Sequence, residues 1–70
     1  MDTIGQKIKY YRQEKGYSNK KLSELSGIAR GYIVELEGAK YLNPSLKVIC
    51  QMCKALEVTP NDLIPKEMYQ

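Results

Sequence analysis

A break in helical periodicity between residues 22 and 38 constrains the fold of this 70-residue chain more than any other feature. The segment LSELSGIARGYIVELEG carries apolar residues at helical spacing on both sides of Gly27. Only residues 26–29 remain for the corner, and glycine readily adopts the left-handed conformation that ends a helix. The pattern predicts two short helices joined by a tight turn. An ordinary helical hairpin in a small bundle is the alternative.

The rest of the chain is also helical in its periodicity, and no segment alternates like a strand. A first helix is expected after Thr3, which can form a capping box with Gln6, and it runs up to Gly16. Ser18 can cap the second helix, which ends at Gly27. The sequence therefore predicts an all-α fold.

Three further helices complete the expected architecture. The third spans about residues 29–37, and GAKYLNPS forms the loop that follows it. Ser45 caps the fourth helix, and in TPNDLIP the fifth begins at Pro60 and ends before Pro65. The expected inward residues are Ile4, Ile8, Tyr11, Leu22, Leu25, Ile28, Ile33, Leu36, Leu46, Ile49, Cys53 and Leu56. We expect a single domain over residues 1–70, with the two-helix unit at about 19–38 and a C-terminal tail at 66–70.

Two charged residues continue these apolar stripes. Arg12 follows Ile8 by four residues on the first helix, and Glu37 follows Ile33 by four on the third. A lone buried charge costs several kcal/mol, whereas a bidentate arginine–carboxylate pair satisfies both groups. We therefore expect Arg12 and Glu37 to form an ion pair that orients the third helix.

The charge is unevenly distributed along the chain. Its net charge is +3, but residues 1–47 hold nine basic and five acidic side chains, whereas residues 48–70 carry a net charge of −1. A basic N-terminal part is typical of nucleic-acid binders, although a mildly basic solvated surface would look the same. No secretory signal or membrane-spanning run is evident, so a cytoplasmic protein without membrane contact is expected.

The outward face of the third helix combines several chemistries suited to DNA bases. Arg30 can donate two hydrogen bonds to guanine, and Gly31 allows close approach of the backbone. Val34 can contact a thymine methyl group, and Glu35 can accept from a cytosine amino group. Tyr32, at the flank, can bond a phosphate or pack against the core. This face favours a helix-turn-helix whose second helix enters the major groove.

The second helix begins with Asn19, Lys20 and Lys21, although a helix N-terminus already carries partial positive charge. Two lysines there are explained if a DNA phosphate docks on the free N–H groups, the lysines and Asn19. Alternatively, the lysines are solubilising side chains that point away from the helix end.

The motifs IKYYRQEKGYS, IVELE, NPSL and VTPNDLI occur in order around Gly27, and over nearly its whole length the chain resembles the helix-turn-helix domain of the Cro and phage-repressor (XRE) family. Within that family it resembles the DNA-binding half of SinR-type repressors. The resemblance implies a compact five-helix, lambda-repressor-like domain in which Arg12 pairs with Glu37 and the third helix reads operator DNA. It also suggests phosphate contacts from Lys40 and Tyr41.

The chain departs from the usual family pattern in three places. Asn19 stands where the family usually has glutamine, which makes a phosphate contact there weaker or water-mediated. Lys20 and Lys21 replace common glutamates and should strengthen backbone binding. The segment from 37 to 44 is one residue longer than in the commonest form of the family, as in SinR-type proteins.

These features predict a non-enzymatic, sequence-specific regulator of transcription that binds double-stranded DNA. We expect a repressor that binds a palindromic operator as a homodimer, because one domain makes few base contacts. The candidate dimer surface comprises Val58, Leu63, Ile64, Met68 and Tyr69, with core packing as the alternative for several of them. The main alternative is an antitoxin or protein-interaction module that binds a toxin or another protein antagonist, with DNA binding secondary.

No cofactor or metal is expected. Cys50 and Cys53 lie three residues apart, and Cys53 falls on the apolar stripe of the fourth helix, so packing is favoured. A zinc site needs four ligands, and the chain has no histidine. A small metal or redox sensor remains a third class of function.

Overall fold

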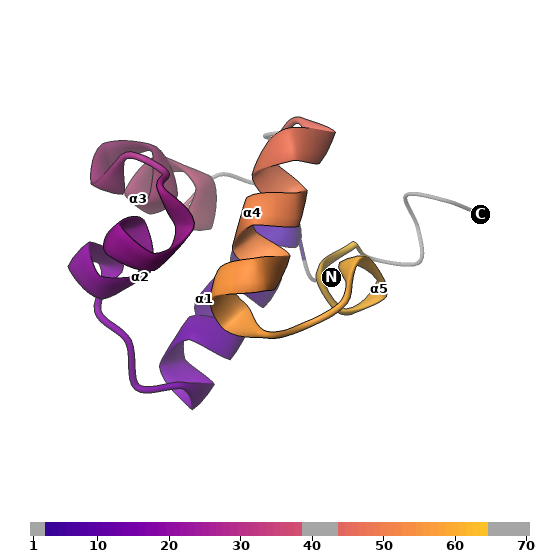
Figure 1. Ribbon diagram of the computed structural model, residues 1–70, viewed down its shortest axis with the longest axis horizontal. Helices are drawn as coiled ribbons and strands as arrows, with labels where there is room; N and C mark the ends of the chain where they lie inside the picture. Colours follow the sequence, from indigo (N-terminus) through magenta and orange to yellow (C-terminus); the bar gives the residue numbers. More distant parts are fainter. Residues whose placement is uncertain (1–2, 39–43, 65–70) are drawn as a thin grey trace.

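The computed structural model describes residues 3–38 and 44–64, which fold into helices without a strand. The helices are α1 (Ile4–Glu14), α2 (Asn19–Ser26), α3 (Arg30–Gly38), α4 (Leu46–Leu56) and α5 (Pro60–Leu63) (Figure 1). The all-α prediction is confirmed, and the helix boundaries agree with the expected ones to within a residue or two. Gly38, expected in the loop, is instead the last residue of α3.

Helix α1 contacts α3, α4 and α5, while α2 packs between α3 and α4. Figure 1 shows α2 and α3 together on one side of the molecule and α5 on the other, with α1 and α4 between them. The pair α2–α3 therefore packs against α1 and α4 and lies at one side of the molecule. Within the described ranges, no helix combines the length and apolar character needed to cross a membrane.

Hydroxyl side chains begin the helices where the sequence predicts. Thr3 accepts from the Gln6 amide and the Gln6 side chain accepts from the Thr3 amide, which completes a capping box. Ser18 and Ser45 likewise accept from amides in the first turns of α2 and α4. Each cap satisfies an N–H group that has no partner within its helix.

Thr59 and Asp62 form a capping box at the start of α5. The Thr59 amide and hydroxyl both donate to Oδ2 of Asp62, at 2.9 and 3.0 Å. These hydrogen bonds favour the ionised carboxylate, and they lower the pKa of Asp62 below its ordinary value of 3.8.

A continuous apolar core joins all the helices, and most of the expected inward residues belong to it. Tyr11 is only partly buried against its edge. Met52 and Ala55 also belong to the core, although they were not among the expected inward residues. The core residues are Ile4, Ile8, Leu22, Ile28, Ile33, Leu36, Ile49, Met52, Cys53, Ala55, Leu56 and Leu63.

Two leucines expected in the core are exposed. Leu25 is 46% exposed. The buried side of α2 is formed by Leu22 and Ser26, and Leu25 points about 100° away from Ser26 around the helix axis. Leu46 is 71% exposed at the start of α4. The buried stripe of that helix is centred on Met52 and Leu56, and Leu46 lies roughly 80–120° from both.

Part of the expected dimer surface is also core. Leu63 is fully buried, and Val58 and Ile64 are partly buried against the core cluster. A side chain that already fills its own domain is unavailable to a partner, so Leu63 takes the core position that was the alternative for several of these residues. Met68 and Tyr69 lie outside the described residues.

Gly5 allows α1 to approach α3 more closely than a side chain would permit. A Cβ at this position would meet the carbonyl oxygen of Leu36, a backbone atom that cannot swing aside. Glycine loses more conformational freedom on folding than alanine does, so its presence in the first turn of α1 calls for a packing reason. The close approach of α1 to α3 is that reason.

We expect Gly5→Ala to lower the free energy of unfolding by about 1–3 kcal/mol, because the two helices must move apart to accept the methyl group. Gly31→Ala is the matched control at the same position of α3, since a Cβ there meets nothing and stability should stay unchanged or rise slightly. Urea denaturation measures both. A stabilised Gly5→Ala variant would contradict the close packing of α1 on α3.

Candidate nucleic-acid interface

The corner between α2 and α3 is built from four residues. Gly27 ends α2 in the left-handed conformation with φ of 75°. Ile28 then anchors the turn in the core, where it is 7% exposed. Ser23 and Ser26 both bond the backbone of Ile28 from α2. The two helices are therefore joined by a short and well-paired turn, as the sequence predicts.

The two faces of α3 differ sharply in burial. Ile33 and Leu36 are fully buried and hold the helix on the core. The residues expected to read bases are all exposed: Arg30, Gly31, Val34 and Glu35. The structure therefore brings these four residues together on one solvent-facing side of a single helix, with Val34 contributing an apolar surface that is 51% exposed.

Tyr32 lies at the edge of this face. It is partly buried and packs against the core cluster, which agrees with the packing role weighed for it. A phosphate contact through its hydroxyl stays a prediction.

The N-terminus of α2 carries exposed lysines, which fits both a phosphate contact and solubilising side chains. Lys20 and Lys21 are exposed, whereas Asn19 is partly buried. The Ser18 hydroxyl accepts from the Lys21 amide at 3.0 Å, so the cap uses that N–H group. The amides of Asn19 and Lys20 precede it in the first turn, where an α-helix provides no intrahelical acceptor.

The side chain of Asn19 is incompletely paired. Its Oδ1 atom is buried and has no hydrogen-bond partner. An oxygen acceptor cannot receive a bond from a phosphate, so only the amide NH₂ group could serve as a phosphate donor.

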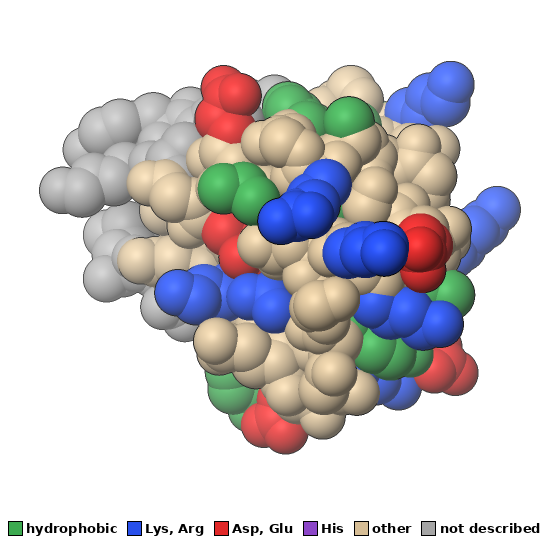
Figure 2. All heavy atoms as spheres, turned by 90° about the vertical axis from the view of Figure 1, so that its left-hand side faces the viewer, with side chains coloured by type: hydrophobic (Ala, Val, Ile, Leu, Met, Phe, Trp, Pro, Cys, Tyr) green, Lys and Arg blue, Asp and Glu red, His purple; other side chains and the backbone are tan. Residues whose placement is uncertain are grey.

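Basic side chains gather on the side that carries α2 and α3. Figure 2 shows Lys and Arg side chains in a band across the middle of that face, interrupted by a few acidic side chains. Such a band attracts a polyanion and is the electrostatic footprint of a nucleic-acid binder. Lys40 and Tyr41, the other expected phosphate contacts, lie outside the described residues.

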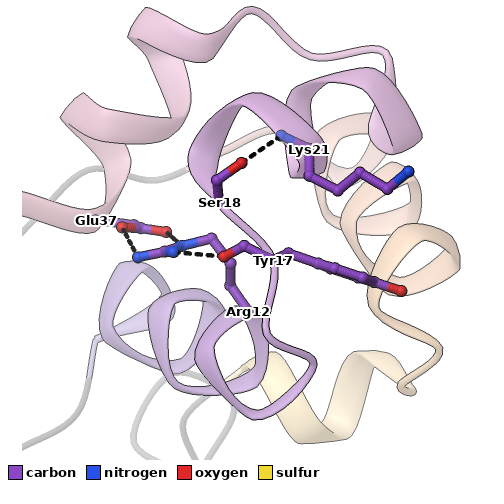
Figure 3. A network of polar contacts seen from close by, with 5 residues as sticks. All are labelled: Arg12, Tyr17, Ser18, Lys21 and Glu37. Atoms are coloured by element: carbon purple, nitrogen blue, oxygen red, sulfur yellow. Dashed lines mark hydrogen bonds and ion pairs between the residues drawn. The ribbon is translucent and has the colours of Figure 1, made fainter.

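The ion pair expected between Arg12 and Glu37 joins α1 to the C-terminal end of α3 (Figure 3). Arg12 donates through Nε to Oε2 at 2.8 Å and through Nη2 to Oε1 at 3.2 Å. Its Nη1 donates to the carbonyl of Tyr17 at 2.8 Å, a contact that sequence reasoning did not anticipate. The Arg12 and Glu37 side chains are only 13% and 8% exposed. One guanidinium therefore ties α3 to α1 and to the turn before α2.

The two cysteines occupy different environments on α4. Cys53 is in the core, and burial raises the pKa of its thiol, which keeps it protonated and unreactive. Cys50 is exposed. The packing role expected for Cys53 therefore agrees with its position.

Comparison with known proteins places this geometry among DNA-binding regulators. A family model described as "Helix-turn-helix" matches residues 8–63. The HTH-type transcriptional regulator SinR of Bacillus subtilis (strain 168) is 38% identical over 64 residues, which cover 91% of this chain and 58% of that protein. The chain spans little more than half the length of the curated relatives it matches first.

Two solved structures are similar in both fold and sequence. One is the crystal structure of SinR, the master regulator for biofilm formation, in complex with DNA, with a TM-score of 0.83 and 39% identity over 87% of this chain and 97% of that one. The other is the complex of the SinR and SinI proteins, with a TM-score of 0.85 and 37% identity over 93% of this chain and 63% of that one.

Proposed function

The chain belongs to the helix-turn-helix family and is similar to the HTH-type transcriptional regulator SinR, and from this premise we propose that it is a sequence-specific, double-stranded DNA-binding repressor of transcription. In this proposal α3 is the recognition helix and lies in the major groove. The protein acts on DNA in the cytoplasm and catalyses no reaction.

One observation carries the proposal. The inward residues of α3 are fully buried, while its outward side exposes Arg30, Gly31, Val34 and Glu35. A helix that packs on the core with one side and exposes the other to solvent can enter a DNA groove without unfolding or uncovering the core. The mixture of a guanidinium, a carboxylate and an aliphatic group matches the edges of different base pairs.

Each of these residues has a proposed role in base reading. Arg30 donates to O6 and N7 of guanine, and Gly31 permits close approach of the helix. Val34 contacts a thymine methyl group, and Glu35 accepts from the amino group of cytosine.

Phosphate contacts then fix the domain on the duplex. The N-terminus of α2 is proposed to bind a phosphate through the backbone N–H groups of its first turn and the side-chain NH₂ group of Asn19. The ammonium groups of Lys20 and Lys21 add charge at the same place. Tyr32 supplies a hydroxyl at the edge of α3, and Lys40 and Tyr41 are proposed to contact the backbone further along.

A palindromic operator and a homodimer complete the proposal. A two-fold pair of domains places its recognition helices about 34 Å apart, one turn of DNA. Among the described residues, Val58 and Ile64 keep part of their apolar surface outside the core and are the proposed contacts near α5.

The decisive experiment is the selection of bound duplexes from a random DNA pool, followed by sequencing. We expect enrichment of a motif with guanine in each half-site and half-site centres about 10 base pairs apart. Recovery of no enriched sequence at low ionic strength would contradict sequence-specific binding, and a motif without inverted symmetry would contradict the dimer.

Removing a single phosphate contact should affect all duplexes alike. We expect Lys21→Ala to weaken binding to selected and scrambled DNA by a similar factor and to reduce the slope of log K against log [salt] by about one unit. Lys54→Ala, at an exposed position in the last turn of α4, is the charge-matched control and should leave the slope unchanged. Fluorescence anisotropy at several salt concentrations measures both. A loss confined to the selected duplex would assign Lys21 to base reading instead.

A second candidate function, binding of a protein antagonist or toxin, has one supporting observation. The similar SinR protein was solved in complex with another protein, SinI. Coexpression with the products of neighbouring genes and a pull-down tests this candidate. A stable partner that blocks DNA binding would identify an antagonist, and a toxic partner would favour the antitoxin alternative.

A further inference from the structure

The hydroxyl groups of Ser23 and Ser26 converge on one residue in the turn between α2 and α3. Ser23 donates through Oγ to the carbonyl of Ile28 at 2.6 Å. The Ile28 amide donates to Oγ of Ser26 at 3.2 Å. Both polar backbone groups of Ile28 are therefore held by side chains from α2.

This arrangement goes beyond what packing requires. Small residues are needed where α2 and α3 cross, and alanine would meet that need equally well. Ser26 is also 7% exposed, and burying a hydroxyl costs free energy unless it is hydrogen-bonded. Gly27, the neighbouring residue, is conformationally permissive and cannot by itself hold the direction of the chain.

We infer that Ser23 and Ser26 are positioning residues that fix the direction in which α3 is presented to DNA, an inference that rests on the proposed function. They hold the N-terminal end of α3, next to Arg30 and Gly31. The C-terminal end is held separately by the Arg12–Glu37 ion pair and by the contact of Gly5 with the Leu36 backbone. The recognition helix is thus fastened at both ends by different elements.

The length of α3 explains why the hydrogen bonds that hold its N-terminal end matter for base reading. The 9 residues of α3 span about 13 Å, so a rotation of about 10° about the C-terminal end moves the first turn by about 2 Å. Hydrogen bonds tolerate only about 0.5 Å in donor–acceptor distance. A small change in helix direction therefore removes the bidentate contact of Arg30 while leaving phosphate contacts on flexible lysines largely intact.

The test is the double variant Ser23→Ala/Ser26→Ala, which keeps both residues small and helix-forming and removes only the hydroxyls. At a temperature well below its unfolding midpoint, we expect the ratio of affinities for the selected over a scrambled duplex to fall about tenfold. Affinity for the scrambled duplex should stay within about twofold of wild type, because it depends on phosphate contacts. Residual dipolar couplings of the free protein should show a changed angle between α2 and α3.

Thr3→Val is the matched control, since it removes the hydroxyl that caps α1 and leaves the α2–α3 turn intact. Its discrimination ratio and interhelical angle should equal those of the wild type, although its stability falls. The inference is overturned if the double variant keeps the wild-type ratio to within twofold while the wild type discriminates between duplexes. If the wild-type chain discriminates between no duplexes at all, the proposed function fails and the inference fails with it.

Discussion

Replacing Arg12 with alanine should lower the free energy of unfolding by about 3–5 kcal/mol, the largest effect we expect from a single substitution. The variant leaves the Glu37 carboxylate, whose side chain is 8% exposed, without its bidentate partner. It also leaves the Tyr17 carbonyl without the 2.8 Å hydrogen bond from Nη1. Urea denaturation followed by circular dichroism measures the change.

Lys15→Ala is the control for this experiment, because it breaks an ion pair of similar length in a different environment. Lys15 and Glu57 lie 3.0 Å apart, but their side chains are 36% and 71% exposed. Exposed pairs contribute only about 0–1 kcal/mol, so stability should change little. If both variants lose the same free energy of unfolding, the buried Arg12–Glu37 pair contributes no more to stability than the exposed Lys15–Glu57 pair.

The double variant Arg12→Met/Glu37→Leu separates the cost of an orphaned charge from the value of the pair. Apolar side chains of similar size often replace a buried ion pair without loss of stability. We therefore expect the double variant to recover most of the stability that Arg12→Ala loses. If it does not, the geometry of the pair together with the hydrogen bond from Arg12 to the Tyr17 carbonyl, rather than the need to neutralise Glu37, holds α3 in place.

Arg30→Ala should weaken binding to the selected duplex by about 1–3 kcal/mol and relax the preference for guanine at one position in each half-site. Arg30 is exposed in the first turn of α3, so the substitution should leave stability nearly unchanged. Binding measured on duplexes with each of the four base pairs at that position reveals the relaxed preference.

Arg30→Lys is the matched control, because it keeps the charge and removes the planar fork of donors. If Arg30 reads guanine, lysine should restore general affinity but only part of the discrimination. If Arg30 instead contacts a phosphate, lysine should restore binding on every duplex, and alanine should weaken all duplexes equally. The second pattern would contradict the proposed base-reading role.

One expectation about tertiary structure could be reached from the sequence. Arg12 and Glu37 are separated by 25 residues, yet both continue apolar stripes at a spacing of four. A buried charge must find an opposite charge, so the stripes predicted both the pair and the contact between α1 and α3. The bond from Arg12 to the Tyr17 carbonyl left no comparable pattern, because every residue has such an acceptor.

Burial was harder to predict where a helix has more apolar residues than inward-facing positions. Leu25 and Leu46 are as apolar as Leu22, but they lie on the outer sides of α2 and α4. Met52 and Leu63 fill the core instead. Which residue of a stripe becomes buried depends on the angle at which another helix crosses it, and periodicity alone does not contain that angle.

The sequence by itself determined where the helices begin and end and that a tight turn separates α2 from α3. Caps, glycine conformations and periodicity act over four residues or fewer, so neighbours along the chain suffice to specify them. Only the tertiary structure decided that Gly5 meets the Leu36 backbone and that Met52 and Leu63 pack in the core. Those contacts depend on how separate helices approach one another, and the same approach decides which side of α3 is left free.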